Sequence, residues 1–164
     1  MPQHWRRMGF DQEHIDDIRA AALLHDVGKL ETNRELLHKA ASLTPDEMVE
    51  MRKHVQKGVA VLEPVGGSLR GVLPIILAHH DKYDGSGYSP SKGNEIPIGA
   101  RILAVADADD TLTSDRPYRR AVTSFEARQI VVSSAGTNFD PAVVEAFVDA
   151  FEHGEMEIPE ALVI

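Results

Sequence analysis

Six side chains of the kinds that bind transition metals are spread along this sequence: His25, Asp26, His54, His79, His80 and Asp107. Imidazole and carboxylate ligands together suit Zn, Fe, Mn or Ni, and adjacent His-Asp and His-His pairs are costly to bury unless a cation compensates them. A catalytic zinc takes about three protein ligands, so this set exceeds the need of one ion. Because a carboxylate can bridge two ions, the set predicts a two-metal site of the type that acts on phosphate esters.

Each of these residues also has a simpler interpretation when it is taken alone. His25 and Asp26 could mark a helix end, where a histidine interacts well with the helix dipole. His54 borders an apolar helix face, as many buried histidines do. Asp107 follows the apolar stretch 102–106, where an unpaired carboxylate would be costly. Four predicted helices each contribute a ligand from the edge of an apolar face, which is how helical bundles build metal sites, so we favour the metal site.

The elements that must position these residues are predicted to be helices. Apolar residues recur at helical spacing, and no stretch alternates as a strand would. Thr44 and Thr123 begin capping boxes, Asp140-Pro141 is a further helix start, and Gly28 stands where a C-terminal cap is expected. The expected helices cover residues 16–26, 45–62, 72–80, 98–111, 124–135 and 141–151, with a loop and a short helix in 30–43. The sequence therefore predicts an all-α bundle.

The composition limits the class of protein. The chain has 164 residues, 43% of them hydrophobic, no cysteine and a net charge of −9. It has no long uncharged apolar stretch and no apolar signal core, so we expect a single domain over 1–164 in the cytoplasm, with no membrane segment. The acidic charge argues against nucleic acid as a partner, and the lack of cysteine excludes disulfides and thiolate ligands.

Three segments resemble, in the same order, the motifs of the HD-GYP family, which are bacterial phosphodiesterases of the HD superfamily that hydrolyse cyclic di-GMP. They are LHDVGK at 24–29, HHDKYDGSGY at 79–88 and VADADDTLTSDRPYR at 105–119. The resemblance implies an HD-superfamily helical bundle with a multinuclear metal site in its core, formed by about residues 16–151. It also implies hydrolysis of cyclic di-GMP to linear pGpG, and onward to GMP, by a metal-bridging hydroxide.

The resemblance further implies roles for individual residues. The six residues named first would bind two or three divalent ions, usually Fe or Mn, with Asp26 as the bridge and a catalytic ligand. Lys29 would lie near the scissile phosphate and act in catalysis. Three residues would hold the dinucleotide together with Lys29: Tyr88, Arg116 and Arg119. Asp110 would be a further metal ligand, or would accept a hydrogen bond from one of the metal ligands.

The sequence departs from the family pattern in three places. The signature Gly-Tyr-Pro is Gly87-Tyr88-Ser89 here, and Asp81 stands where glutamate is typical. Only 24 residues precede His25, so we expect this sequence to lack the upstream helix that contributes a further family ligand. We therefore expect a domain that is truncated at its N-terminus.

Two other functions remain open. The departures favour a catalytically weak or inactive module that binds cyclic di-GMP or a diguanylate cyclase domain. A second alternative is an HD-type hydrolase of another nucleotide, for example cyclic GMP-AMP. The expected partners are cyclic di-GMP, a diguanylate cyclase domain and a second copy of the chain in a homodimer.

Overall fold

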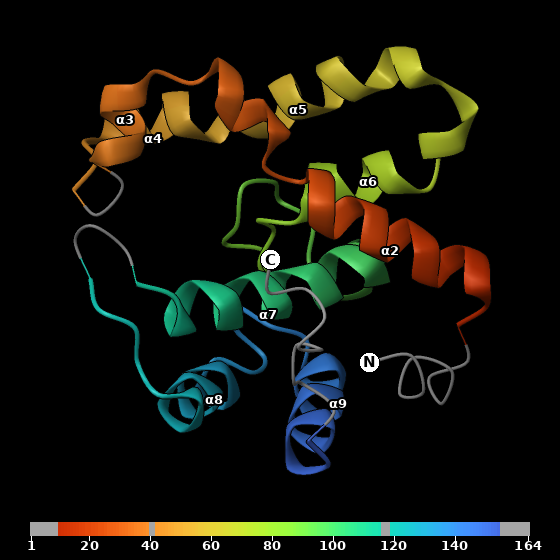
Figure 1. Cartoon of the computed structure of the whole chain (residues 1–164), viewed down its shortest axis with the longest axis vertical. Helices are drawn as coiled ribbons and strands as arrows, with labels where there is room; N and C mark the ends of the chain where they lie inside the picture. The colour runs from red at the N-terminus through yellow and green to blue at the C-terminus, as the bar shows by residue number, and fades with distance from the viewer. Residues whose placement is uncertain (1–9, 40–41, 116–118, 155–164) are drawn as a thin grey trace, which may run out of the picture.

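The computed structural model describes residues 10–39, 42–115 and 119–154, and these ranges contain helices and no strand (Figure 1). The predicted all-α fold is therefore confirmed. No helix in the described ranges is long and apolar enough to cross a membrane. The α-helices are α2 Gln12–Leu24, α3 Arg34–His38, α4 Pro45–Arg52, α5 His54–Leu62, α6 Val72–Ala78, α7 Ile98–Thr113, α8 Ser124–Ser133 and α9 Pro141–Glu152. Short 3-10 helices are η1 Val27–Glu31, η2 Glu63–Val65, η3 Gly67–Leu69 and η4 Gly93–Glu95.

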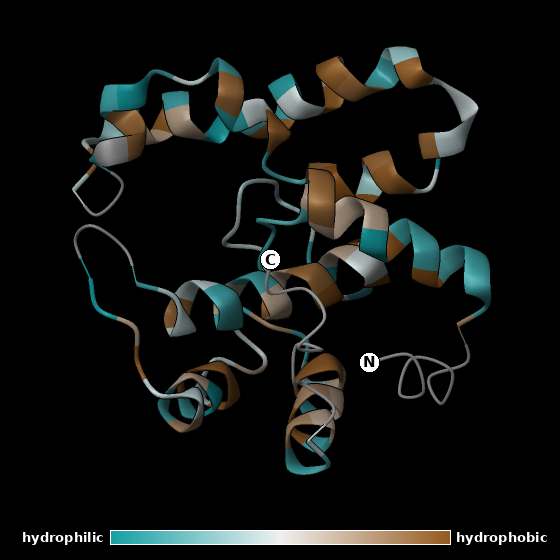
Figure 2. Ribbon diagram, viewed as in Figure 1, coloured by the Kyte–Doolittle hydropathy of each residue, from teal (hydrophilic) through white to brown (hydrophobic). Residues whose placement is uncertain are grey.

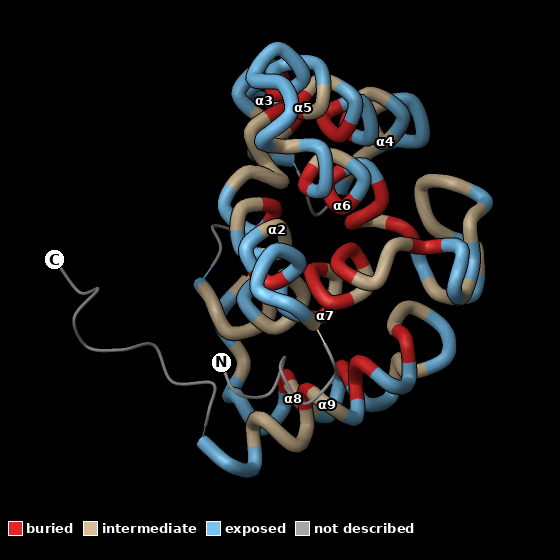
Figure 3. The backbone as a smooth tube through the Cα atoms, turned by 90° about the vertical axis from the view of Figure 1, so that its right-hand side faces the viewer, coloured by how far each residue is buried: buried red, intermediate tan, exposed pale blue. Residues whose placement is uncertain are grey.

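The helices form three tiers. In Figures 1 and 3, α3, α4 and α5 lie at the top, α2, α6 and α7 in the middle, and α8 and α9 at the bottom. The middle tier carries many of the buried residues, drawn red in Figure 3, because α6 and α7 are covered on more than one side. The middle tier therefore connects the upper and lower tiers.

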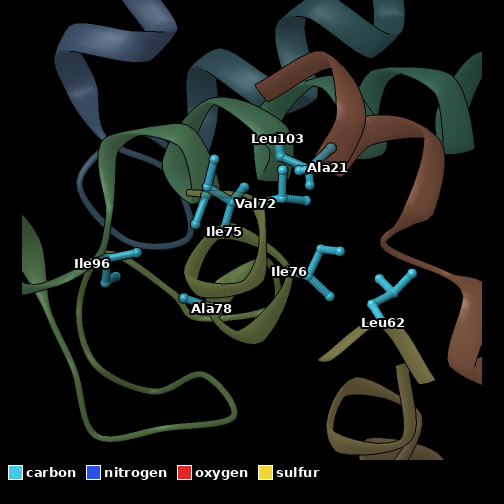
Figure 4. Close-up of a cluster of buried hydrophobic side chains, with 9 residues drawn as sticks. Ala21, Leu62, Val72, Ile75, Ile76, Ala78, Ile96 and Leu103 are labelled. Carbon is cyan, nitrogen blue, oxygen red and sulfur yellow. The ribbon is translucent and has the colours of Figure 1, made fainter. Parts of the chain in front are cut away.

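Two hydrophobic clusters hold these tiers together. The first joins α2, α5, α6 and α7 and includes the fully buried Ala21, Ile76 and Ala100 (Figure 4). The second joins α7 to α8 and α9. Figure 2 shows that α6 is mostly hydrophobic, whereas the first turns of α2 are hydrophilic. Because apolar burial is the main favourable term in folding, these clusters fix the ends of α2, α6 and α7 relative to one another.

Several helix starts lie where the sequence predicts them. Thr44 and Thr123 form complete capping boxes, and the Asp140 side chain accepts a hydrogen bond from the Ala142 N–H at the start of α9. Asp140 also pairs with Arg101 of α7 at 2.5 Å, and this buried pair connects α9 to the middle tier. The short helix expected within 30–43 is α3.

The prediction of one helix over 45–62 is wrong, because the helix breaks at Lys53 between α4 and α5. The predicted helix over 16–26 instead starts at Gln12, behind the cap Asp11, and ends at Leu24. The helix before the His pair ends at Ala78. As a result, His25, His54 and His79 all lie at helix ends rather than inside helices.

Gly28 does not cap α2 as predicted but lies buried in η1. A Cβ at this position would overlap the backbone carbonyl of His54 and lie 2.5 Å from the Gly58 N. Glycine is therefore required because η1 packs backbone to backbone against α5. This contact brings the residues just before η1 next to the first residue of α5.

Candidate metal centre

The junction of α2 and η1 carries the first two predicted ligands. His25 caps the C-terminus of α2, and Asp26 directly precedes η1. The His25 Nε2 lies 3.6 Å from Asp26 Oδ2 and 3.7 Å from Oδ1 of Asp107, which extends from α7. Adjacent side chains on a regular helix diverge by about 100°, so the end of α2 allows both to face one point.

The histidines of α5 and α6 complete the cluster. The His54 Nε2 lies 3.9 Å from Asp26 Oδ1, and its side chain is 1% exposed. The rings of His79 and His80 lie 3.9 Å apart, and the His79 ring is 5.1 Å from that of His25. The structure thus brings the predicted ligands together from four separate segments.

The ligand atoms form two overlapping groups within the described residues. One group is His54, His79 and His80, and the other is His25, Asp26 and His79, with the ligand atoms of each group within 4.8 Å of one another. His79 belongs to both groups. Each group has the number of protein ligands that a catalytic metal ion uses.

Backbone hydrogen bonds fix the orientation of three of these rings. The Nδ1 atoms of His25, His54 and His79 each lie 2.6–2.9 Å from the carbonyl oxygen three residues earlier. A carbonyl only accepts, so Nδ1 carries the proton, and the Nε2 of each neutral ring keeps its lone pair. Metal-binding histidines in proteins are typically held in this way.

The ligand atoms that face inward have no protein partner. Among the described residues, Asp26 Oδ1, His54 Nε2 and His79 Nε2 are buried and make no hydrogen bond. Unsatisfied buried acceptors are rare and cost about 1–3 kcal/mol each. Three acceptors converging on one place fit a cation as their common partner.

The electrostatics keep two histidines neutral. Burial lowers the pKa of His79 to about 4, and burial together with His79 and His54 lowers the pKa of His80 to about 3. Both rings are therefore uncharged near neutral pH and available as ligands.

Two pairs of opposite charge lie beside His79 and His80: His25 with Asp107, and Lys29 with Asp26. The Asp107 carboxylate raises the pKa of His25, although burial opposes this shift. Burial disfavours the charged form of Asp26, but the Lys29 ammonium, 2.6 Å from Oδ2, outweighs it and lowers the Asp26 pKa. Lys29 therefore lies at the edge of the ligand cluster.

The loop after the His pair closes over one side of the cluster. The Tyr88 ring lies 4.7 Å from the His80 ring. A Cβ on Gly87 would lie 2.7 Å from the Asp81 Cα, so this loop is pressed against the segment that carries the histidines. Tyr88 is thus held beside His80 at the rim of the cluster.

Ser89, which replaces the family's proline, connects this loop to Asp81 by hydrogen bonds. Its backbone N–H and its hydroxyl donate to the two carboxylate oxygens of Asp81, at 2.8 and 2.6 Å, and its Oγ accepts from the Ser91 N–H. Proline could make none of these bonds. Two of the departures from the family pattern, Asp81 and Ser89, are therefore direct partners in this chain.

The remaining predicted residues are not all brought to the cluster. Arg119 donates to the backbone carbonyl of Thr111, at the end of α7. Asp110 is exposed and lies outside both ligand groups. Arg116 lies outside the described residues.

Arg52 is a rim residue that the sequence analysis missed. Its guanidinium lies 4.8 Å from the centre of the Tyr88 ring, and the residue is exposed. Its position two residues before His54 was the available signal. Arg52 adds a positive charge beside the aromatic ring.

Comparisons with known proteins agree with this geometry. The sequence model of the HD domain family matches residues 3–143. A cyclic di-GMP phosphodiesterase response regulator from Xanthomonas campestris is 40% identical over 144 residues, which is 87% of this chain and 38% of the relative. A 3'3'-cGAMP-specific phosphodiesterase of Vibrio cholerae is 37% identical over 146 residues, or 88% of this chain and 28% of that protein. The chain thus spans about a third of the length of the curated relatives it matches.

A solved structure supports the fold. An HDGYP protein from Bdellovibrio bacteriovorus aligns with a TM-score of 0.70 at 19% sequence identity, over 91% of this chain and 48% of the other. At that identity the similarity concerns the arrangement of the helices.

Proposed function

Because the chain belongs to the HD domain family, we propose that it is a metal-dependent phosphodiesterase that hydrolyses cyclic di-GMP to linear pGpG and onward to GMP. The observation that carries this proposal is the convergence of inward-facing acceptors on Asp26, His54 and His79 that lack a protein partner among the described residues. Such a set needs a cation, and the two overlapping ligand groups suit two ions.

We infer that these ions are Fe or Mn, bound by the six residues predicted from the sequence: His25, Asp26, His54, His79, His80 and Asp107. Divalent ions at these groups supply Lewis acidity toward the phosphoryl oxygens and lower the pKa of water. Asp26 directs Oδ1 toward His54 and Oδ2 toward His25 and Lys29, and this placement between the groups suits a bridging ligand.

The surrounding residues would bind and orient the substrate. The Lys29 ammonium lies at the edge of the cluster, where it would neutralise a phosphate oxygen. Tyr88 and Arg52 together form a rim that offers an aromatic face and a positive charge. Arg116 and Arg119 stay predicted dinucleotide-binding residues, and Asp110 stays a predicted further metal ligand or hydrogen-bond acceptor for a ligand.

Cyclic GMP-AMP is a second candidate substrate, because one relative at 37% identity is a phosphodiesterase specific for 3'3'-cGAMP. A diguanylate cyclase partner, a homodimer, the cytoplasmic location and the single domain over 1–164 likewise stay predictions.

The test measures metal content and products in parallel. Protein loaded with Mn²⁺ or Fe²⁺ is incubated with cyclic di-GMP and cyclic GMP-AMP, and the products are separated by chromatography. We expect pGpG and GMP from the unmutated chain, and loss of both metal and turnover in His79→Ala, since His79 belongs to both ligand groups.

His14→Ala is the control, because this exposed histidine lies outside the cluster and should keep metal and activity. Full metal occupancy with tight nucleotide binding but no product would select the inactive binding module instead. Equal metal content in His79→Ala and the unmutated chain would contradict the assigned metal centre.

A further inference from the structure

A cavity of about 370 Å³ lies directly beside the metal-ligand cluster. His79, His80 and Asp107 form one of its walls, so a molecule in this cavity touches the proposed metal centre. Its other walls come from Asp81 and Lys82 after the His pair, from α7 and α8, and from the loop after α8. None of the roles assigned above accounts for this space.

The cavity is largely apolar on the sides formed by α7, α8 and Phe139. Ala104 and Ala108 lie one turn apart on α7 and leave room that larger side chains would fill. Phe139, Leu112 and Ile130 complete the apolar surface, and Ile130 is 42% exposed there. An isoleucine left exposed beside a cavity gains free energy when an apolar ligand surface covers it.

Asn138 adds a hydrogen-bonding group to this apolar lining. Its backbone is held at both ends, because its N–H donates to the Ser134 carbonyl at 3.0 Å and its carbonyl accepts from the Tyr83 N–H at 3.2 Å. Its carboxamide makes no hydrogen bond with another described residue and lines the cavity. A carboxamide offers a donor and an acceptor side by side.

We propose that this cavity is the subsite for one purine base of the nucleotide substrate. A purine has two apolar faces, which match the alanine, leucine and phenylalanine walls, and an edge of donors and acceptors that a carboxamide can pair with. The volume is near the lower end of ligand sites, about 300–1,000 Å³, so it takes one base rather than a whole dinucleotide. The proposal rests on the proposed function, since it is the phosphate at the metal centre that would bring the base here.

The test compares two ligands that differ only in the base. GMP and ribose 5-phosphate are titrated calorimetrically into the Mn²⁺-loaded chain. We expect GMP to bind at least about tenfold tighter than ribose 5-phosphate. Ala108→Leu, which fills the cavity, should abolish this difference and leave the affinity for ribose 5-phosphate unchanged. Asn138→Ala should reduce the difference about threefold or more.

Ala106→Leu is the matched control, because Ala106 lies on the same helix but is exposed and outside the cavity lining. The control should keep the preference for GMP. The proposal is overturned if GMP has no advantage in the unmutated chain, if the advantage survives in Ala108→Leu, or if that variant weakens both ligands equally.

This outcome is separable from that of the hydrolysis test. A preference for GMP without turnover of cyclic dinucleotides would leave the base subsite standing and remove the proposed activity. Turnover of cyclic dinucleotides without a preference for GMP would support the proposed activity and overturn the base subsite.

Discussion

The histidines of the metal centre owe their protonation state to their own helices. His25, His54 and His79 each lie at a helix end, with Nδ1 against the carbonyl three residues earlier. A backbone carbonyl is a fixed acceptor, so the ring is oriented before any ion arrives and loses little conformational freedom on binding. This is a local arrangement that recurs at three separate places in the chain.

Acid should destabilise the metal-free protein through His79. Its pKa is lowered to about 4 in the fold, whereas an unfolded histidine titrates near 6.5, so the unfolded state takes up the proton first. The free energy of unfolding therefore falls as the pH drops from about 6.5 to about 4, by about 3 kcal/mol for His79 alone. Urea unfolding of the metal-free protein at about pH 7 and about pH 5 measures the part of this loss that falls between the two pH values, about 2 kcal/mol.

The comparison with His79→Gln isolates this residue, because glutamine does not titrate. His25 contributes in the opposite direction, since Asp107 raises its pKa. We expect the glutamine variant to lose less stability between the two pH values than the unmutated protein. The exposed His14→Gln should not reduce the loss. An unchanged acid dependence in His79→Gln would show that this histidine is not held neutral by burial.

Ser89→Pro should destabilise the loop that carries Tyr88. The substitution removes both bonds to the Asp81 carboxylate, which is 7% exposed and would remain buried without them. We expect a loss of about 1–3 kcal/mol in the free energy of unfolding and a higher KM for the dinucleotide. Ser89→Ala keeps the backbone N–H bond and should lose less. If proline and alanine at this position gave equal stability, the backbone bond would be unimportant.

At the scale of the elements, the contact between η1 and α5 sets the distance between Asp26 and His54. Gly28→Ala should disrupt it, because the new methyl group meets the rigid backbone of His54 and Gly58 rather than a movable side chain. We expect a loss of about 1–3 kcal/mol, typical of overpacking, and weaker metal binding. Thermal unfolding and metal titration measure the two effects.

Gly67→Ala is the matched control for this variant. A Cβ at Gly67 meets no atom within 4 Å, so alanine there should leave both stability and metal affinity nearly unchanged. A Gly28→Ala variant that behaves like Gly67→Ala would mean that η1 can move away from α5 at little cost.

Most helices could be predicted from the sequence because their signals are local. The capping boxes of Thr44 and Thr123 lie within one turn and are both present in the structure. The break at Lys53 could not be predicted, since the apolar spacing continues through it. The prediction of Gly28 as a helix cap failed because its actual role is a contact with α5, about thirty residues later, and no local signal records such a contact.

The same reasoning applies to the site. Adjacent ligands such as His25-Asp26 and His79-His80 are visible in the sequence, and the structure brings them together. The bond between Asp81 and Ser89 and the contact of Arg52 with Tyr88 depend on how a loop folds back, which no periodic pattern records. The cavity beside α7 likewise depends on the packing of α8, so it could not be inferred from spacing.

On the scale of the whole molecule, the metal centre lies where the tiers meet. Its ligands come from the α2–η1 junction, α5, the end of α6 and α7, and α7 also packs on α8 and α9 through the second hydrophobic cluster. Bound ions would therefore connect segments that are distant in sequence. Metal binding should stabilise the whole fold rather than one loop.

Saturating Mn²⁺ should accordingly raise the melting temperature of the chain. An ion at 100 times its Kd stabilises the folded state by about 2.7 kcal/mol, which corresponds to about 5–10 °C for a protein of this size. His54→Ala removes a buried ligand and should lose most of this shift, whereas the exposed His14→Ala should keep it. Differential scanning calorimetry with and without a chelator measures the change. Equal shifts in the two variants would place the ion on the surface, away from the cluster where the upper and middle tiers meet.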